Sequence, residues 1–319
     1  MLRKVPRPTF GPLAGRRSRA QARRSAPAAL VRLGGPEAAG WRLGEPFEGR
    51  GDTNVFAVQA DGGSPALLKA TASRQGRLQL ERQVRVLAAL HDDARLGPWA
   101  RLLPRTLACG EVEGMAFVLE SRLPGSDSRR LPESERARVI PLALETIADL
   151  QARTRTVEPI DAATLDRWVR EPAERVREVV RGTHRAALDV LQARLVAALS
   201  GRAVVRCWAH GDYNQTNVLF DGGQVSGVVD WTEAEPDGLA GADAVTLLMF
   251  ERILAGTELG PVLLEWLADP SPVAGVVGEM QRSGPGAASP ARCGRVTRAG
   301  RSPFEGRGRR PRWAPLAQQ

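Results

Sequence analysis

Residues 210 to 217 read HGDYNQTN, and this octapeptide gathers residue types that the chain uses sparingly. It holds one of three histidines, two of three asparagines and the only tyrosine, Tyr213. An apolar stretch broken by Asp-Gly-Gly follows, and then Asp230 appears within GVVDW, thirteen positions after Asn217. Residues 218 to 229 read as two short strands around a turn. We therefore expect a hairpin whose open end brings Asn217 and Asp230 side by side.

The oxygen-bearing side chains of this region suit phosphoryl transfer. That reaction needs a carboxylate beside the attacking hydroxyl, and oxygen ligands that hold Mg²⁺ against the nucleotide phosphates. Asp212, Asn217 and Asp230 supply these groups. Paired strands lie roughly 4.8 Å apart, close enough for two side chains to share a metal. The alternative is an ordinary surface turn, because Asp, Gly and Asn favour turns through local hydrogen bonds.

The spacing HxDxxxxN resembles the catalytic loop of protein kinases, with Gly211 where those enzymes have arginine. Asp230-Trp231 stands where they have Asp-Phe-Gly. With these two departures, about residues 41 to 250 resemble the aminoglycoside phosphotransferase and choline kinase group. The resemblance implies an α+β, two-lobed, protein-kinase-like fold, with a small N-terminal antiparallel sheet lobe and a larger, mainly helical C-terminal lobe.

The same resemblance implies roles for individual residues. Asp212 would be the catalytic base that accepts the proton of the substrate hydroxyl, and His210 would brace the loop. Asn217 and Asp230 would bind magnesium, and ATP would be the phosphoryl donor. The implied activity is an ATP- and magnesium-dependent O-phosphotransferase acting on a small hydroxyl-bearing molecule, with an aminoglycoside-like acceptor favoured.

Lys69 is the only lysine outside the N-terminal arm, in a chain with 45 basic residues. It ends the strand-like run PALLKA. A compact ammonium on a flexible stem suits a point charge on phosphates, whereas the planar fork of arginine suits bidentate contacts. We predict that Lys69 binds the nucleotide phosphates. The alternative is a surface lysine whose stem covers apolar neighbours.

A glycine-containing loop from Glu48 to Asn54 joins two strand-like runs ahead of that lysine. Gly49 and Gly51 would let backbone N–H groups approach phosphate, so these glycines and Asn54 are candidate nucleotide contacts. Taken alone the loop is a weak signal, because a hairpin turn also needs glycine for its positive φ.

The helical stretch LQLERQVRVLAALH follows, and Glu81 is its only acid. Kinase-like lobes require an ion pair between the phosphate-binding lysine and the next helix. We therefore predict that Lys69 pairs with Glu81. The alternative is an exposed Glu81 paired with Arg77 or Arg85 at four-residue spacing.

The segment TLACGEVEGMAFVLESRLPG reads as two strands that run into a connector from Glu120 to Gly125. This connector resembles the hinge of the family. Adenine would bond to main-chain groups there, so Glu120 and Arg122 are expected only as neighbours of the nucleotide.

Charge divides the chain into three parts. Residues 1 to 36 carry a net +9 and residues 281 to 319 a net +8, so the total of +9 leaves −8 for residues 37 to 280. Both ends lack hydrophobic periodicity, and we expect them to be a disordered basic arm and a disordered tail. Between them we expect a nucleotide-binding N-lobe at 37 to 122 and a catalytic C-lobe at 123 to 280.

An acidic body suits a cationic small-molecule acceptor better than nucleic acid, although the charge could simply keep the protein soluble. RNA or DNA binding through the basic ends is a weaker rival. The arm resembles a transit peptide in composition, but no signal-peptide pattern and no apolar run of membrane length occurs, so we expect a cytoplasmic protein without membrane contact. Three separated cysteines support neither a disulfide framework nor a zinc site. The sequence does not determine the oligomeric state.

The C-terminal region is the weak point of the resemblance. Three acids, Glu233, Glu235 and Asp237, lie where the acceptor pocket of the family begins. Asp243 is expected either to brace the catalytic loop or, equally well, to be a charge that stabilises a helix N-terminus. After its helix we expect only one more, near 258 to 268, whereas relatives continue through several. The alternative function is therefore a catalytically weak or inactive nucleotide-binding, kinase-like regulator with a truncated acceptor lobe.

Overall fold

The computed structural model describes residues 12–34, 40–47, 52–60, 65–131, 135 and 138–282. Contacts within the chain divide it into two units. Unit 1 comprises the described parts of Met1–Ala143 together with Asp212–Ala234, and unit 2 comprises Leu144–Gly211 with the described part of Glu235–Ser289. The predicted catalytic residue Asp212 and the predicted hairpin thus group with the N-terminal residues.

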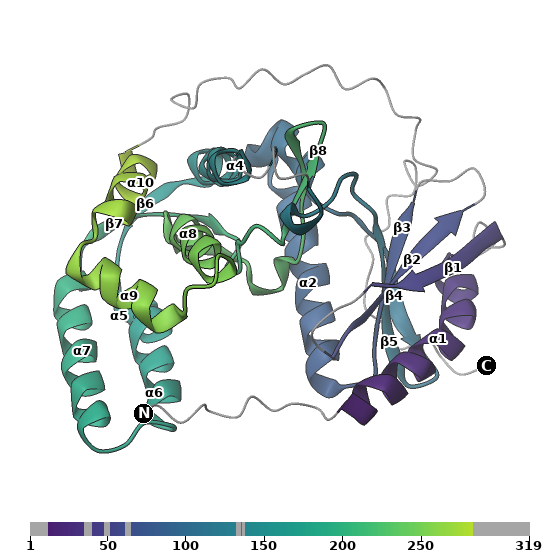
Figure 1. Ribbon diagram of the computed structural model, residues 1–319, viewed down its shortest axis with the longest axis horizontal. Helices are drawn as coiled ribbons and strands as arrows, with labels where there is room; N and C mark the ends of the chain where they lie inside the picture. Colours follow the sequence, from purple (N-terminus) through teal and green to yellow (C-terminus); the bar gives the residue numbers. More distant parts are fainter. Residues whose placement is uncertain are drawn as a thin grey trace. The chain divides into compact units, whose positions relative to one another are not determined.

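An antiparallel sheet of five strands, in the order β1-β2-β3-β5-β4, forms the centre of unit 1 (Figure 1). Its strands are β1 (Trp41–Pro46), β2 (Asn54–Ala60), β3 (Ala66–Thr71), β4 (Thr106–Val112) and β5 (Met115–Ser121). Every strand lies in a run that the sequence predicts as a strand. The expected α+β fold with an N-terminal antiparallel sheet is confirmed.

Helices cover both faces of this sheet. Successive side chains of a strand point to opposite faces, so each face has its own set of contacts. Met115, Phe117 and Leu119 of β5 pack in a cluster with side chains of helix α1 (Pro12–Gly34). The alternate residues Ala116 and Val118 pack with helix α2 (Arg74–Asp92). In Figure 1 the purple α1 and the blue α2 flank the strands, and β5 is buried along almost its whole length.

Helix α1 corrects the expectation of a disordered arm at residues 1 to 36. Ala22, Ala26, Ala29 and Leu30 are at most 3% exposed and belong to the sheet's core cluster. Their spacing of four, three and one residues puts them on one helix face, and three small side chains allow that face to lie close to the strands. The lack of periodicity in large apolar residues was therefore a misleading sign of disorder, because the buried face of α1 is made mainly of alanines. Residues 1 to 11 and 35 to 36 lie outside the described residues.

The predicted hairpin is present as β8 (Val218–Asp221) and β9 (Gln224–Val228). Its two central residues, Gly222 and Gly223, have φ of 55° and 73°, as a two-residue turn of type I′ requires. Unit 1 also contains the short helices η2 (Ala94–Leu102), η3 (Ser128–Arg130) and η5 (Trp231–Glu233).

Unit 2 contains a second antiparallel sheet in the order β10-β7-β6, made of β6 (Thr156–Pro159), β7 (Ala203–Ala209) and β10 (Glu235–Leu239). Helix α4 (Val139–Thr154) enters the unit at Leu144. The remaining helices are α5 (Ala162–Leu165), the π-helical η4 (Asp166–Arg170), α6 (Glu171–Arg177), α7 (Thr183–Leu199), α8 (Ala242–Leu254), α9 (Leu259–Ala268) and α10 (Ser271–Arg282). One helix after α8 was expected, so α10 is an addition. The expected tail from residue 281 lies outside the described residues, except for the end of α10.

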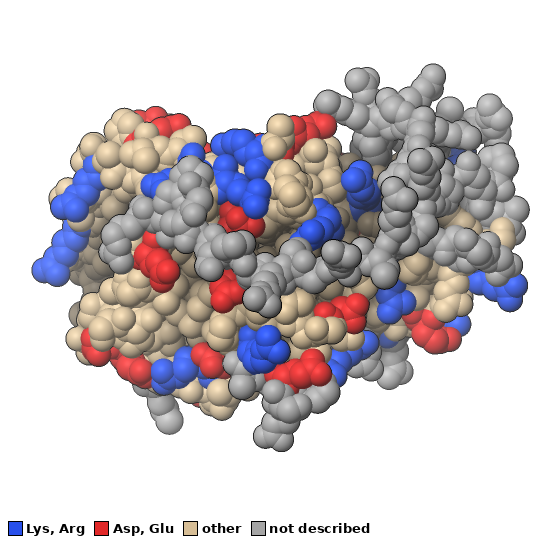
Figure 2. Space-filling view, turned by 90° about the horizontal axis from the view of Figure 1, so that it is seen from above, with Lys and Arg blue, Asp and Glu red and all other residues tan. Residues whose placement is uncertain are grey.

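Among the described residues, no helix combines the length and the apolar character needed to span a membrane. On the face shown in Figure 2, basic and acidic side chains of the described residues are interspersed.

Candidate active site

The start of the predicted catalytic loop is held by a buried carboxylate of unit 2. Asp243, in the first turn of α8, accepts hydrogen bonds from the backbone N–H groups of His210 (2.8 Å) and Gly211 (2.9 Å). Gln151 adds a contact to the same carboxylate at 3.4 Å. Gly211 has φ of 80°, a conformation that side chains other than glycine rarely adopt. These hydrogen bonds give the expected bracing role of Asp243 a structural basis. The positive φ at position 211 explains why the residue there is glycine.

Asp243 and His210 are both buried. Burial raises the pKa of Asp243, whereas the charge of His210 and the hydrogen bonds to the carboxylate act in the opposite direction. A buried carboxylate is tolerated where donors satisfy its oxygens. The contact between Asp243 and the backbone therefore fixes the start of the loop at His210 and Gly211.

Asp212 is surrounded by amide side chains of its own loop. The Nδ2 atom of Asn217 donates to the Asp212 backbone carbonyl (2.9 Å) and to its Oδ2 (3.2 Å). The Nδ2 atom of Asn214 donates to the same carbonyl (3.1 Å) and to Oδ1 (3.2 Å). Tyr213 is buried and donates to the carbonyl of Ala143 at 2.8 Å. Both carboxylate oxygens of Asp212 are thereby oriented.

The hairpin brings Asn217 and Asp230 to its open end, as the sequence predicts. Val218 pairs with Val228, and the backbone N–H of Val229 donates to the carbonyl of Asn217 at 2.9 Å. Asp230 follows with φ of 66° and ψ of 61°. A left-handed non-glycine residue is uncommon, and such residues cluster at functional sites. Among the described residues, only Glu113 shares this feature, in the turn between β4 and β5.

The oxygen atoms of Asn217 and Asp230 at the open end of the hairpin are compatible with magnesium binding. The described residues contain no cluster of three or more His, Cys, Asp or Glu that could hold a metal. Mg²⁺ typically uses one or two protein oxygen ligands and completes its shell with water and substrate phosphates. An amide oxygen of Asn217 and a carboxylate of Asp230 are a set of that kind.

Lys69 corrects a second expectation, because it pairs with Glu120 and not with Glu81. Lys69 Nζ lies 3.0 Å from Glu120 Oε2, and the two side chains are 13% and 3% exposed. In the register of β3 and β5, Leu67 faces Glu120 and Lys69 faces Val118. Lys69 and Glu120 are therefore diagonal neighbours on one face of the sheet, within reach of long side chains.

Helical periodicity explains why Glu81 is not the partner. The buried residues of α2 include Leu80, Gln83, Val84 and Leu87, which follow the spacing i, i+3, i+4 and i+7 of one helix face. Glu81 lies about 100° around the helix from Leu80 and is only half-buried. Gln83 takes the inward position instead, and its Nε2 donates to Glu120 Oε1 at 2.6 Å.

Gln83 and Thr232 are site neighbours that the sequence reasoning missed. The hydroxyl of Thr232 lies 3.3 Å from Gln83 Oε1 and 3.2 Å from Asp230 Oδ1. The helical stripe of α2 could have identified Gln83, since a polar residue at a buried position needs a partner. Thr232 had no comparable signal.

The remaining residues predicted to lie near the nucleotide are Gly49, Gly51, Asn54, Glu120 and Arg122. Gly49 and Gly51 lie outside the described residues. Asn54 begins β2, opposite Ala70. Glu120 lies inside β5 and not in the connector after it. The guanidinium of Arg122 lies over the ring of Phe47, 5.7 Å from its centre.

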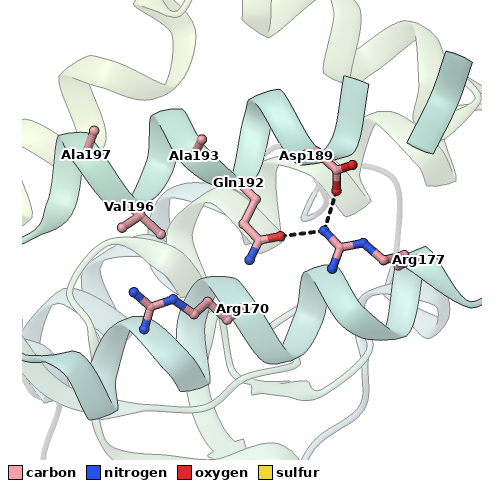
Figure 3. A pocket seen from close by; sticks show the side chains of 7 residues that line it. All are labelled: Arg170, Arg177, Asp189, Gln192, Ala193, Val196 and Ala197. Carbon is pink, nitrogen blue, oxygen red and sulfur yellow. Dashed lines mark hydrogen bonds and ion pairs between the residues drawn. The ribbon is translucent and has the colours of Figure 1, made fainter. Parts of the chain in front are cut away.

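Two features of the described residues are not part of this arrangement. Cys109 and Cys207 are unpaired, and burial raises the pKa of their thiols to about 11 and about 12, which makes both poor nucleophiles. A hollow of about 380 Å³ lies in unit 2 between Arg170, Arg177 and helix α7 (Figure 3). Arg177 is paired there with Asp189 and Gln192, and none of the predicted site residues lines the hollow.

Solved structures share this fold. The chain is similar to the crystal structure of the aminoglycoside phosphotransferase APH(4)-Ia, with a TM-score of 0.52 and 20% identity over 81% of this chain and 97% of that chain. A thermostable mutant of that phosphotransferase, in a ternary complex with AMP-PNP and hygromycin B, gives a TM-score of 0.51 and 20% identity over 82% of this chain and 99% of that chain.

Sequence comparisons identify the family. No curated protein sequence gives a match. The model of the phosphotransferase enzyme family matches residues 44–276, which include the predicted catalytic loop, the hairpin and all strands of both sheets except the first part of β1. The chain therefore belongs to the phosphotransferase enzyme family.

Proposed function

We propose that the protein is an ATP- and magnesium-dependent O-phosphotransferase that acts on a small hydroxyl-bearing acceptor. One observation carries this proposal. Asn217 donates to the Asp212 carboxylate at 3.2 Å, and its backbone carbonyl accepts from Val229, the residue before Asp230. The three residues that carry these groups thus lie in one loop and at the open end of one hairpin of unit 1, with Asp230 connected to Asn217 through the backbone of Val229.

Asp212 is the proposed catalytic base. Its carboxylate accepts the proton of the acceptor hydroxyl while the hydroxyl oxygen bonds to the γ-phosphorus of ATP. The bond between that phosphorus and the bridging oxygen breaks, and ADP leaves with the electron pair. The amide groups of Asn214 and Asn217 hold the Asp212 carboxylate in place, which is the positioning that such catalysis depends on.

Asn217 and Asp230 are the proposed magnesium ligands, and Lys69 the proposed phosphate contact. Bound magnesium neutralises charge on the nucleotide phosphates. Glu120 keeps the Lys69 ammonium in a defined place in the buried part of the sheet. The thermostable mutant of APH(4)-Ia, which has the same fold, is described as a complex with AMP-PNP. This supports a nucleoside triphosphate as the phosphoryl donor here.

A cationic aminoglycoside is the favoured acceptor. The net charge of −8 for residues 37 to 280 favours cationic ligands, and hygromycin B is named in the complex of the similar phosphotransferase. Membership of the family indicates phosphoryl transfer but does not identify the acceptor, because acceptor sites differ within one fold. Amino alcohols and sugars therefore belong in the same screen.

The test is a phosphorylation screen of purified full-length protein with ATP and Mg²⁺ over aminoglycosides, amino alcohols and sugars. ADP release and the mass of the product are measured, and the Asp212→Asn variant is the blank. We expect a phosphorylated product with the wild type and none with the variant, whose affinity for ATP stays unchanged because the carboxylate acts on the acceptor.

Two results would contradict the proposal. Turnover by Asp212→Asn at the wild-type rate would remove the assigned base. ATP binding without transfer to any member of the screen would favour the alternative of a kinase-like regulator.

A further inference from the structure

A continuous set of polar contacts joins the proposed phosphate contact to a proposed metal ligand within unit 1. Lys69 Nζ lies 3.0 Å from Glu120 Oε2, and Gln83 donates to Glu120 Oε1 at 2.6 Å. The Thr232 hydroxyl lies 3.3 Å from Gln83 Oε1 and 3.2 Å from Asp230 Oδ1. These residues come from β3, β5, α2 and η5, so the contacts exist only in the folded chain.

Gln83 has the chemistry that this position requires. The Glu120 side chain is 3% exposed, and a buried carboxylate must be satisfied on both oxygens. Lys69 satisfies one oxygen and the amide N–H of Gln83 the other. A carboxylate at position 83 would repel Glu120, and an apolar side chain would leave its Oε1 without this donor. The amide also offers an acceptor oxygen at its other edge, where it meets Thr232.

The Thr232 hydroxyl lies between two acceptors. It has one proton, and both Gln83 Oε1 and Asp230 Oδ1 are within hydrogen-bond distance. Asp230 and Gln83 therefore compete for the same donor. A cation on the Asp230 carboxylate makes that oxygen a weaker acceptor, and the hydroxyl then turns toward Gln83 Oε1. Hydrogen-bonded groups in a chain polarise one another, so the bond from Gln83 to Glu120 strengthens and the partner of Lys69 is held more firmly.

Resting on the proposed function, in which Lys69 binds phosphate and Asp230 binds magnesium, we infer that Gln83 and Thr232 are positioning residues that couple these two events. Neither residue touches the reacting atoms in this role. Their contribution is that magnesium binding improves the binding of the nucleotide phosphates by Lys69.

The experiment measures the affinity of full-length protein for a fluorescent ATP analogue, once with EDTA and once with Mg²⁺. The ratio of the two dissociation constants is the magnesium-dependent gain. Thr232→Val and Gln83→Leu are expected to reduce this gain about three- to tenfold, the loss of one hydrogen bond. Thr232→Ser keeps the hydroxyl and is expected to keep the gain.

The double variant separates coupling from a general structural effect. If Gln83 and Thr232 act through the same set of contacts, the double variant Thr232→Val/Gln83→Leu has the same magnesium-dependent gain as the more strongly affected single variant. Gln75→Leu, at an exposed site on the same helix, is the control for the glutamine change. Thr246→Val is the control for the threonine change, because that hydroxyl donates to a carbonyl of its own helix. Both controls are expected to retain the wild-type gain.

The outcomes distinguish this inference from the proposed function. Wild-type gain in both single variants, or losses that multiply in the double variant, would overturn the coupling while ATP binding by the wild type stands. A wild type without magnesium-dependent ATP binding would defeat the proposed function itself. Circular dichroism checks folding, and if Gln83→Leu does not fold, the comparison of Thr232→Val with Thr232→Ser decides the question.

Discussion

Two glutamates compete as the partner of Lys69, and only one of them lies against it. Glu120 is buried and contacts the ammonium, whereas Glu81 lies off the buried face of α2. Glu120→Gln removes the charge that holds Lys69, so we expect the affinity for ATP to fall about tenfold or more. Titration with a fluorescent ATP analogue measures it.

Glu81→Gln is the matched control for that experiment. It makes the same chemical change on the half-buried Glu81, and we expect an affinity within about twofold of the wild type, because surface ion pairs contribute little. A loss of affinity in Glu81→Gln, with none in Glu120→Gln, would restore the helix carboxylate as the partner.

Asp243 satisfies two backbone donors at the entrance to the catalytic loop. Asp243→Ala leaves the N–H groups of His210 and Gly211 without this acceptor. An unsatisfied buried donor costs about 1–3 kcal/mol, and His210 is fully buried, so we expect a clear loss in the free energy of unfolding and a fall in kcat. Urea unfolding and the phosphorylation assay measure the two effects.

Asp243→Asn provides the internal comparison. It retains one acceptor oxygen, so we expect stability and kcat between those of the wild type and of Asp243→Ala. Equal behaviour of the alanine variant and the wild type would show that the carboxylate does not hold the loop.

Helix α1 adds a layer to the sheet of unit 1, and its contact face is made of small side chains. Ala26 is fully buried, whereas Ala28 is exposed. Ala26→Leu introduces volume against the strands, and we expect the free energy of unfolding to fall by about 1–3 kcal/mol, the usual result of overpacking. Ala28→Leu makes the same change on the exposed face and is expected to stay within about 0.5 kcal/mol of the wild type. Urea unfolding compares them, and equal stability would mean that α1 does not pack on the sheet.

Elements differ in how far local sequence predicts them. The strands of the five-stranded sheet and the hairpin follow from alternation and from glycines in the turns, whereas β6 and β10 of the second sheet were not predicted. Helix α1 does not, because small residues on one face give a weak hydrophobic signal although they pack closely. Helix α10 was likewise not predicted.

Ligand binding links the proposed site to the stability of the whole molecule. A ligand that binds only the folded state, present at about 100 times its Kd, stabilises that state by about 2.7 kcal/mol. We therefore expect ATP with Mg²⁺ to raise the melting temperature in a thermal-shift assay.

Chelation and a site variant are the controls for this prediction. EDTA is expected to remove most of the shift, because Asn217 and Asp230 then hold no cation. Asp230→Ala is expected to reproduce the effect of EDTA in the presence of Mg²⁺. A full shift in that variant would remove Asp230 from the metal site.

The sequence by itself determined the parts that depend on neighbours along the chain. HxDxxxxN, the Asp-Gly-Gly turn and the alternating strands are patterns of a few residues. The turn and strands predicted a hairpin that brings Asn217 and Asp230 together, and the resemblance carried by HxDxxxxN added Asp212 to them. Tertiary structure decided which distant side chains meet. Glu120 and Gln83 are 37 residues apart, and Thr232 and Gln83 are 149 apart. Their contact depends on strand register, on the inward face of α2 and on the packing of the hairpin, which are properties of the folded chain and not of any one segment.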